Sequence, residues 1–159
     1  MTFQVGIGQD SHRFEEKISD KKCLVGGVVF PDAPGLSADS DGDVVLHAIC
    51  NAITSVTHVP ILGEVAPQLC QKGITDSRVY LEKALETLGR KNINHVALAI
   101  EGKRPKFQAK AEDIRKSLSG LLKISIDRIG ITFTSGDGLT SFGRGEGLQC
   151  FCILTIAEF

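Results

Sequence analysis

The stretch Ser40-Asp-Gly-Asp-Val-Val-Leu-His-Ala-Ile-Cys-Asn-Ala-Ile-Thr-Ser-Val56 contains the clearest structural signal in the chain. Its apolar residues recur every three or four positions, the spacing of an amphipathic helix. The polar residues before them have the form of a capping box, with Ser40 as the cap and Asp43 in place of the commoner Glu. We therefore predict a helix between about Gly42 and Val56 with one apolar stripe against the core: Val45, Ala48, Ile49, Ala52 and Ile53.

Shorter patterns on both sides of this helix predict the rest of the fold. Their order, β-β-α-α-β-α-β-β, favours an α+β sandwich with the helices on one face of a mixed sheet. Within that class we expect the ferredoxin-like split βαβ arrangement. No repeat or linker interrupts the chain, so residues 1–159 are expected to form a single domain. The predicted strands cover about 4–9, 22–30, 95–100, 128–134 and 148–157, and the other helices about 77–88 and 108–122.

The charge balance argues against several classes of partner. The 159 residues include 18 Lys and Arg against 19 Asp and Glu, for a net charge of −1. A chain so close to neutral is not expected to bind nucleic acid through a basic surface. With one Tyr and no Trp, it also lacks the aromatic residues on which bases stack. The apolar runs are too short to span a bilayer, so no membrane partner is expected.

The five cysteines are odd in number and form no CxxC pair, so neither a disulfide framework nor a cysteine zinc site is predicted. Cys150 and Cys152 alternate along a predicted strand, and we interpret them as small core residues. A reducing, cytoplasmic compartment is the simplest expectation. For a plant protein the plastid stroma would be the alternative, although no transit peptide is visible.

Asp10 and His12 lie one residue apart at the end of the first predicted strand. Because side chains alternate along a strand, both point to the same face, about 7 Å apart. His47 adds a second imidazole near the start of the predicted helix. An Asp-His-His set would supply the three protein ligands of a catalytic zinc site, which keeps its fourth position open.

Each of these residues also has a simpler interpretation. Asp-x-His often occurs by chance as a pair of polar loop residues. His47 could be a partly buried histidine bonded to Asp43, one turn earlier in the helix. His58 and His95 lack comparable acidic neighbours, and we interpret them as ordinary surface or core histidines.

Two polar loops have compositions suited to an anionic ligand. Residues 37–43 lead into a helix N-terminus, whose free N–H groups attract anions, although capping explains their aspartates equally well. Residues 134–147 combine hydroxyls, an acid, five glycines and Arg144, which suits close contact with phosphate. A bulged β-hairpin with an ordinary ion pair between Arg144 and Glu146 explains the same composition.

Five collinear motifs together resemble one family, the 2-C-methyl-D-erythritol 2,4-cyclodiphosphate synthases (MECDP synthases) of the non-mevalonate isoprenoid pathway. The pair G-x-D-x-H-R-F and S-D-G-D-V-x-x-H-A is highly specific, and the resemblance covers nearly the whole chain. The motifs are Gly8-Gln-Asp-Ser-His-Arg-Phe14, Ser40-Asp-Gly-Asp-Val-Val-Leu-His-Ala48, Thr75-Asp-Ser-Arg78, Pro105-Lys106 and Gly143-Arg-Gly-Glu-Gly147.

The resemblance implies a homotrimer around a central β-prism, with active sites between neighbouring subunits. It implies Zn²⁺ on Asp10, His12 and His47, and a second divalent cation, Mg²⁺ or Mn²⁺, on an acid of the C-terminal loop. The implied reaction converts 4-diphosphocytidyl-2-C-methyl-D-erythritol 2-phosphate to 2-C-methyl-D-erythritol 2,4-cyclodiphosphate and releases CMP. In such a phosphorus–oxygen lyase the substrate's own 2-phosphate attacks its β-phosphate, so no protein nucleophile is needed. The cytidine diphosphate moiety is expected near residues 102–108.

The chain departs from the family pattern at several positions. Asp137 stands where the acid for the second metal is usually Glu, and Asp39 stands where a His usually assists the phosphates. Ser135 replaces the usual Thr. The nearest match to a family G-D-I-G segment makes Glu64 the candidate for contacting the sugar, and the loop over residues 57–75 is expected to differ in shape.

The resemblance also assigns the remaining site residues. Arg144 and Glu146 match an arginine and a glutamate at one end of an apolar cavity on the family's trimer axis, where an isoprenoid diphosphate could bind. The catalytic set that the resemblance implies is Asp39, Ser135 and Asp137, and the substrate-binding set is Asp10, His12, Asp39, Ser40, Glu64, Gly102, Lys106, Thr134, Ser135, Asp137, Ser141, Phe142 and Arg144.

Two other functions stay open. One is a metal-dependent phosphohydrolase, and the other is an isoprenoid-diphosphate-binding trimer that has lost catalysis.

Overall fold

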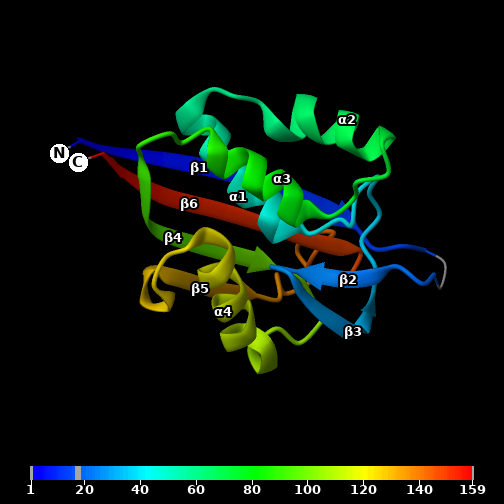
Figure 1. The fold of residues 1–159 in the computed structure, drawn as a ribbon. Coiled ribbons are helices and arrows are strands. Elements are labelled where there is room, and N and C mark those ends of the chain that lie inside the picture. Colours follow the sequence, from blue (N-terminus) through cyan, green and yellow to red (C-terminus); the bar gives the residue numbers. More distant parts are fainter. Residues whose placement is uncertain (1, 17–18, 159) are drawn as a thin grey trace.

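A four-stranded mixed sheet forms the centre of the computed structural model, which describes residues 2–16 and 19–158 (Figure 1). In the sheet order β1-β6-β4-β5, β6 is antiparallel to both of its neighbours. β4 and β5 run parallel, because helix α4 carries the chain back between them. The strands are β1 (Thr2–Arg13), β4 (Asn92–Glu101), β5 (Ile129–Thr134) and β6 (Gly147–Glu158).

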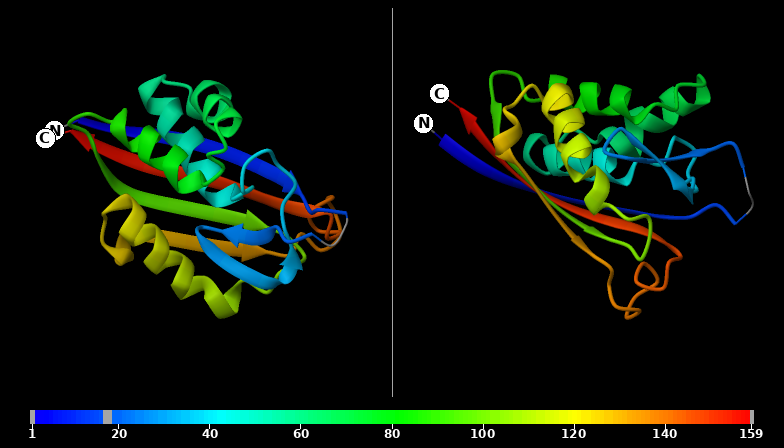
Figure 2. Two further views of the ribbon diagram at one scale, coloured as in Figure 1. Left: turned by 45° about the vertical axis from the view of Figure 1, so that its right-hand side comes forward. Right: turned by 90° about the horizontal axis from the view of Figure 1, so that it is seen from below.

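The α-helices lie on one face of this sheet (Figure 2). Helix α1 packs on β1 and β6, α3 packs on α1, and α4 packs against β5. The apolar stripe predicted for α1 is fully buried. Between α1 and α3 the chain forms a short π-helix, η1, followed by α2, so residues 57–75 are largely helical. The helices are α1 (Val44–Thr57), η1 (Ile61–Val65), α2 (Ala66–Gln71), α3 (Ser77–Glu86), η2 (Gln108–Lys110), α4 (Ala111–Leu122) and η3 (Ile126–Arg128).

Two glycines of β1 allow α1 to lie unusually close to the sheet. A Cβ atom on Gly6 would come within 2.3 Å of the Ala52 carbonyl oxygen, and one on Gly8 within 2.1 Å of the Ala48 carbonyl oxygen. Any side chain at either position would therefore push the helix away from the strand. This close approach holds the first turns of α1 above the end of β1.

Asp43 joins α1 to a small hairpin outside the main sheet. The hairpin, β2 (Lys22–Val25) and β3 (Val28–Pro34), turns at Gly26 and Gly27, whose N–H groups donate to the Asp43 carboxylate at 2.9 and 2.6 Å. The same carboxylate accepts from the N–H groups of Val45 and Leu46. Asp43 is thus the cap of α1, and the prediction that Ser40 caps this helix was wrong.

The α+β class, the mixed sheet and the placement of the helices are confirmed, but the ferredoxin-like connectivity is not. The main sheet is built in the order β-α-β-α-β-β, whereas the split βαβ arrangement is β-α-β-β-α-β. Strand β4 lies between β5 and β6, so residues 134–147 do not close a β-hairpin either. The segment predicted as one strand over 22–30 is the β2–β3 hairpin. Strand pairing between distant segments depends on packing, which periodicity does not report.

The sheet face opposite the helices carries exposed apolar side chains on β1 and β6. Their exposed fractions lie between 44% and 68%. On the helix-covered face, Cys150 and Cys152 are fully buried, as predicted, and burial raises the pKa of the Cys152 thiol to about 12. The exposed apolar residues are Phe3, Val5, Ile7, Phe151 and Ile153.

Among the described residues, none of the helices is by itself long and apolar enough to cross a membrane; only the bent pair Val44–Thr57 and Ile61–Gln71 passes that test, by length and composition.

Candidate metal centre

The three predicted metal ligands meet between β1 and α1. The alternation of β1 turns Asp10 and His12 toward the helix layer, and α1 carries His47 above them. One Asp10 oxygen, Oδ2, lies 2.7 Å from His12 Nε2 and 3.1 Å from His47 Nδ1, and the two ring nitrogens are 3.2 Å apart. Three donor atoms of the kinds that zinc prefers therefore converge within 4.8 Å of one another.

The cluster is mostly shielded from solvent. The side chains of Asp10, His12 and His47 are 21%, 18% and 7% exposed. Burial alone would raise the pKa of Asp10, but hydrogen bonds from His12 and His47 outweigh it and leave the pKa lowered. The carboxylate therefore stays ionised beside two imidazoles. An ionised oxygen and two ring nitrogens on converging side chains fit a divalent cation of the zinc type.

A pocket of about 280 Å³ opens onto this cluster. Asp39 and Ser40 both line this pocket. Asp39 is exposed, whereas Ser40 is buried and its hydroxyl oxygen lies 3.4 Å from His47 Nε2. The structure thus brings both of these predicted residues to the cluster. Tyr80 and Cys70, which the sequence did not single out, also line the pocket, together with Ala38, Leu62, Ala66 and Pro67.

The second ring nitrogen of His47 faces a hydroxyl on another helix. His47 Nε2 lies 2.7 Å from the Oγ of Ser77, the first residue of α3, and that hydroxyl donates to Asp41. The alternative in which the His47 ring bonds to the Asp43 side chain is wrong, because backbone N–H groups occupy the Asp43 carboxylate and the ring bonds to Asp10 and Ser77. Sequence reasoning missed this role of Ser77. The available signal was its place in the motif Thr75-Asp-Ser-Arg78.

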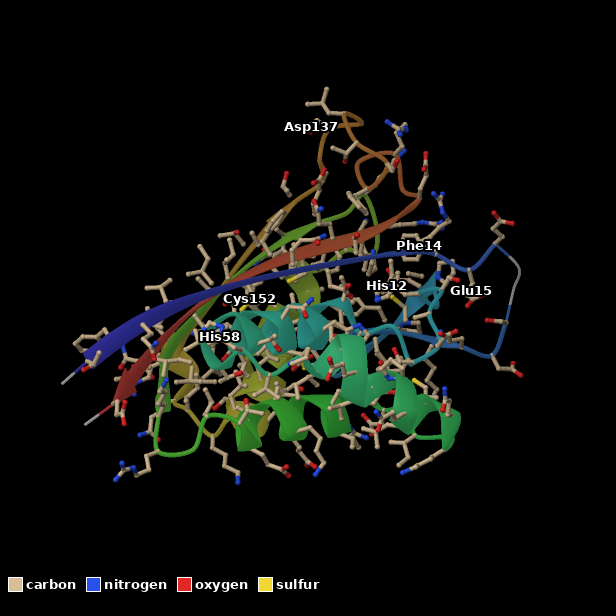
Figure 3. The ribbon with its side chains drawn as sticks, turned by 90° about the horizontal axis from the view of Figure 1, so that it is seen from above. His12, Phe14, Glu15, His58, Asp137 and Cys152 are labelled. Atoms are coloured by element: carbon tan, nitrogen blue, oxygen red, sulfur yellow. The ribbon has the colours of Figure 1, made fainter. Side chains whose placement is uncertain are left out.

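Residues 134–147 form a loop that projects away from the helices. Figure 3 shows Asp137 at the tip of this loop, well apart from His12. Asp137 is exposed, has a left-handed backbone conformation (φ 48°), and accepts a hydrogen bond from Ser135 Oγ at 3.1 Å. The structure therefore does not bring Ser135 and Asp137 to the Asp-His-His cluster of the same chain.

The base of this loop holds the predicted ion pair. Arg144 Nε lies 3.2 Å from Glu146 Oε1, and Arg13 Nη1 lies 3.4 Å from the other Glu146 oxygen. Ser141 and Phe142 line a second pocket, of about 300 Å³, that also includes Arg13 and Glu146. These residues lie at the end of the sheet where β1 and β6 meet the loop.

The other predicted binding residues are separate from the metal cluster. Glu64 is exposed on η1 and does not line the pocket of the cluster, although Leu62 of the same segment does. Gly102 is buried at the end of β4, where its N–H donates to the Thr134 carbonyl oxygen at 3.0 Å. Lys106 is exposed on the following segment.

The fold and the cluster define a class: an α+β protein with an Asp-His-His cluster that is able to hold a metal ion at the junction of a strand and a helix. The chain belongs to the YgbB family, whose profile matches residues 3–157.

Curated relatives and solved structures agree with this assignment. A protein of Chlamydia caviae named 2-C-methyl-D-erythritol 2,4-cyclodiphosphate synthase is 55% identical over 159 residues, covering 99% of this chain and 90% of the relative. A protein of the same name from Chlamydia felis is 54% identical with the same coverage. A solved structure of such a synthase with bound CDP superposes with a TM-score of 0.85, at 27% identity, covering 97% of this chain and all of the other. The family predicted from the motifs is confirmed.

Proposed function

We propose that this chain is a MECDP synthase, which cyclises 4-diphosphocytidyl-2-C-methyl-D-erythritol 2-phosphate to 2-C-methyl-D-erythritol 2,4-cyclodiphosphate and releases CMP. The observation that carries the proposal is the convergence of Asp10, His12 and His47 in a chain that is similar over its full length to synthases of that name. Because the nucleophile is a phosphate of the substrate, the protein has to position and neutralise charge rather than attack. We also propose a cytoplasmic location.

Two cations belong to this proposal. Asp10, His12 and His47 would hold Zn²⁺, and Asp137 would hold Mg²⁺ or Mn²⁺. When bound, such cations neutralise phosphate charge and polarise the phosphorus under attack. The chain's own contribution is to orient the phosphates: the hydroxyls of Ser40, Thr134 and Ser135 would donate hydrogen bonds to their oxygens. Asp39 is an anion in the position of a usual His, so it needs a proton or a cation beside it when phosphate is near.

A homotrimer with active sites between subunits is the assembly that we propose. Two observations support it. Asp137 lies well apart from the metal cluster of its own chain, so a site that uses both needs a second copy. In addition, β1 and β6 expose a continuous apolar face of a kind that soluble monomers rarely leave uncovered. Packing three such faces together would build a central β-prism.

An isoprenoid diphosphate in the central cavity is a further part of the proposal. Arg144 stands at the end of the exposed face and would supply three guanidinium groups in a trimer. We expect Arg144→Ala to weaken the binding of geranyl diphosphate, measured by calorimetry. Unchanged affinity in that variant would argue against a role for this arginine.

Phosphorus NMR of the reaction distinguishes the proposed activity from its alternatives. With the diphosphocytidyl substrate, Zn²⁺ and Mg²⁺, we expect the cyclic diphosphate and CMP to appear together. A linear phosphate product would favour the phosphohydrolase, in which water is the nucleophile. Absence of turnover combined with binding of isoprenoid diphosphate would favour the non-catalytic trimer. The retention of Asp10, His12, His47 and Asp137 speaks against that loss of catalysis.

A further inference from the structure

His47 is held at both of its ring nitrogens. Nδ1 faces the metal cluster, 3.1 Å from Asp10 Oδ2, and Nε2 faces Ser77 Oγ at 2.7 Å. The Ser77 hydroxyl in turn donates to Asp41 Oδ1. The loop before α1, α1 itself and the distant start of α3 therefore form one line of polar groups.

The direction of the hydrogen bonds along this line follows from the chemistry of its end member. The Ser77 hydroxyl donates to the carboxylate oxygen of Asp41, so its hydrogen is fixed on that side. The free lone pairs of Ser77 Oγ then accept a hydrogen from His47 Nε2. A neutral imidazole that carries its hydrogen on Nε2 presents an unprotonated Nδ1, which is the form that binds a metal ion.

Burial and backbone contacts hold the line in place. Ser77 is completely buried and His47 is 6% exposed, so water has little access to replace the hydroxyl. Asp41 is fixed by further hydrogen bonds, from the Ser77 N–H at 2.9 Å and the Asp43 N–H at 3.1 Å. Ser40 Oγ is a longer neighbour of Nε2, at 3.4 Å. Ser77 is thus the principal partner of this nitrogen.

We propose that Ser77 and Asp41 are positioning residues for the metal centre: through Ser77, the Asp41 carboxylate selects the tautomer and the ring orientation in which His47 offers Nδ1 to the metal. The inference rests on the proposed metal site, and it concerns metal binding before any substrate is present. Partners of this kind behind a metal-bound histidine restrict its motion and raise its basicity.

The test measures zinc affinity by competition with a chromophoric chelator, in the absence of substrate. For Ser77→Ala we expect zinc affinity to fall about 10- to 100-fold, the usual cost of losing such a partner. Asp41→Asn should lower the zinc affinity as well. In the zinc-loaded wild type, nitrogen-15 NMR should show the His47 Nε2 hydrogen bonded and protected from exchange, and Ser77→Ala should lose that protection. Ser77→Thr restores a hydroxyl and should recover both the zinc affinity and the exchange protection of the His47 Nε2 hydrogen.

Ser119→Ala is the matched control, because Ser119 Oγ on α4 donates an equally short bond, 2.7 Å, to the Ile124 carbonyl oxygen, and neither residue lines the pocket. It should bind zinc as the wild type does. Two results would overturn the inference. One is a wild-type zinc affinity in both Ser77→Ala and Asp41→Asn, and the other is a loss of zinc affinity in Ser119→Ala as large as that in Ser77→Ala. Thermal unfolding of each metal-free variant separates lost ligand positioning from lost folding. A wild type that binds zinc but forms no cyclic product would refute the proposed reaction and leave this inference standing, whereas a wild type that binds no zinc overturns both.

Discussion

The Asp10-His12-His47 cluster and the loop over residues 134–147 differ in how firmly contacts within the chain hold them in place. In the cluster, the side chain of His47 is 7% exposed and contacts Asp10, His12 and Ser77 at distances of 2.7–3.2 Å. In the loop, Asp137 is exposed, and Leu139, two residues further on, is 85% exposed. The cluster draws on β1, α1 and α3, whereas the loop is held below its tip, where Thr140 donates to Glu101 and the Lys103 N–H donates to the Phe142 carbonyl oxygen, and the tip projects beyond these contacts (Figure 2).

A single chain therefore organises the Asp10-His12-His47 cluster fully, but it does not fix the position of the tip of the loop over residues 134–147. Burial, the hydrogen bonds among the three ligands and the contact of Ser77 with His47 organise the cluster before any cation arrives. The tip of the loop has little of either, so its position has to be fixed by something outside the chain, such as the second subunit and the cation that we propose. The predictions below test the two regions separately.

The largest expected effect is that of His12→Ala on the cluster. Removing one of three ligands should weaken zinc binding by more than about 100-fold, because even an outer partner is worth 10- to 100-fold. Cyclase activity should be lost with it. The variant should still fold and keep the oligomeric state of the wild type, as judged by circular dichroism and light scattering. Full activity without bound zinc would refute the assignment of these ligands.

A smaller effect is expected from Gly8→Ala, which adds a methyl group between β1 and α1. The added Cβ would overlap backbone atoms of α1, which should cost about 1–3 kcal/mol of unfolding free energy. For a chain of this length that corresponds to roughly 2–4 °C in Tm per kcal/mol. The control is Gly63→Ala, where a Cβ meets nothing within 4 Å and Tm should not fall. Equal stability of the two variants would contradict the close packing of α1 on β1.

The smallest effect on the folded chain is expected for Asp137→Asn in the loop. Asn tolerates the left-handed conformation as well as Asp does, so Tm should stay within about 2 °C of the wild type. Zinc content should also be unchanged. Cyclase activity should require a higher Mg²⁺ concentration, because the carboxylate charge is lost, and Asp137→Glu should retain activity. An unaltered Mg²⁺ dependence in Asp137→Asn would remove this residue from the second metal site.

Local features of this fold could be predicted from the sequence. The helical period of Val45, Ala48 and Ile49 fixed the buried face of α1, and the alternation of Asp10 and His12 placed both on one side of β1. Both patterns depend on geometry within one element, which the sequence carries directly.

Contacts between distant segments could not be predicted in the same way. Ser77 lies 30 residues from His47, and no spacing rule links a hydroxyl at the start of one helix to a ring on another. The cap of α1 was predicted at Ser40 for a related reason. In the structure Asp43 is the cap, and its carboxylate also accepts from the N–H groups of Gly26 and Gly27 in the distant hairpin turn. The order of β4, β5 and β6 likewise depends on how α4 packs.

The pairing of β1 with β6 has a consequence for the order of events during synthesis. Asp10 lies opposite Cys150 and His12 opposite Leu148, so the strand with two of the ligands pairs with a strand that the ribosome makes long after it (Figure 1). At about 5–20 residues per second, roughly 7–28 s separate the translation of Asp10 from that of Cys150. Throughout that interval β1 lacks its neighbour in the sheet. The strand pairing that holds Asp10 and His12 in place therefore forms only after β6 has been translated.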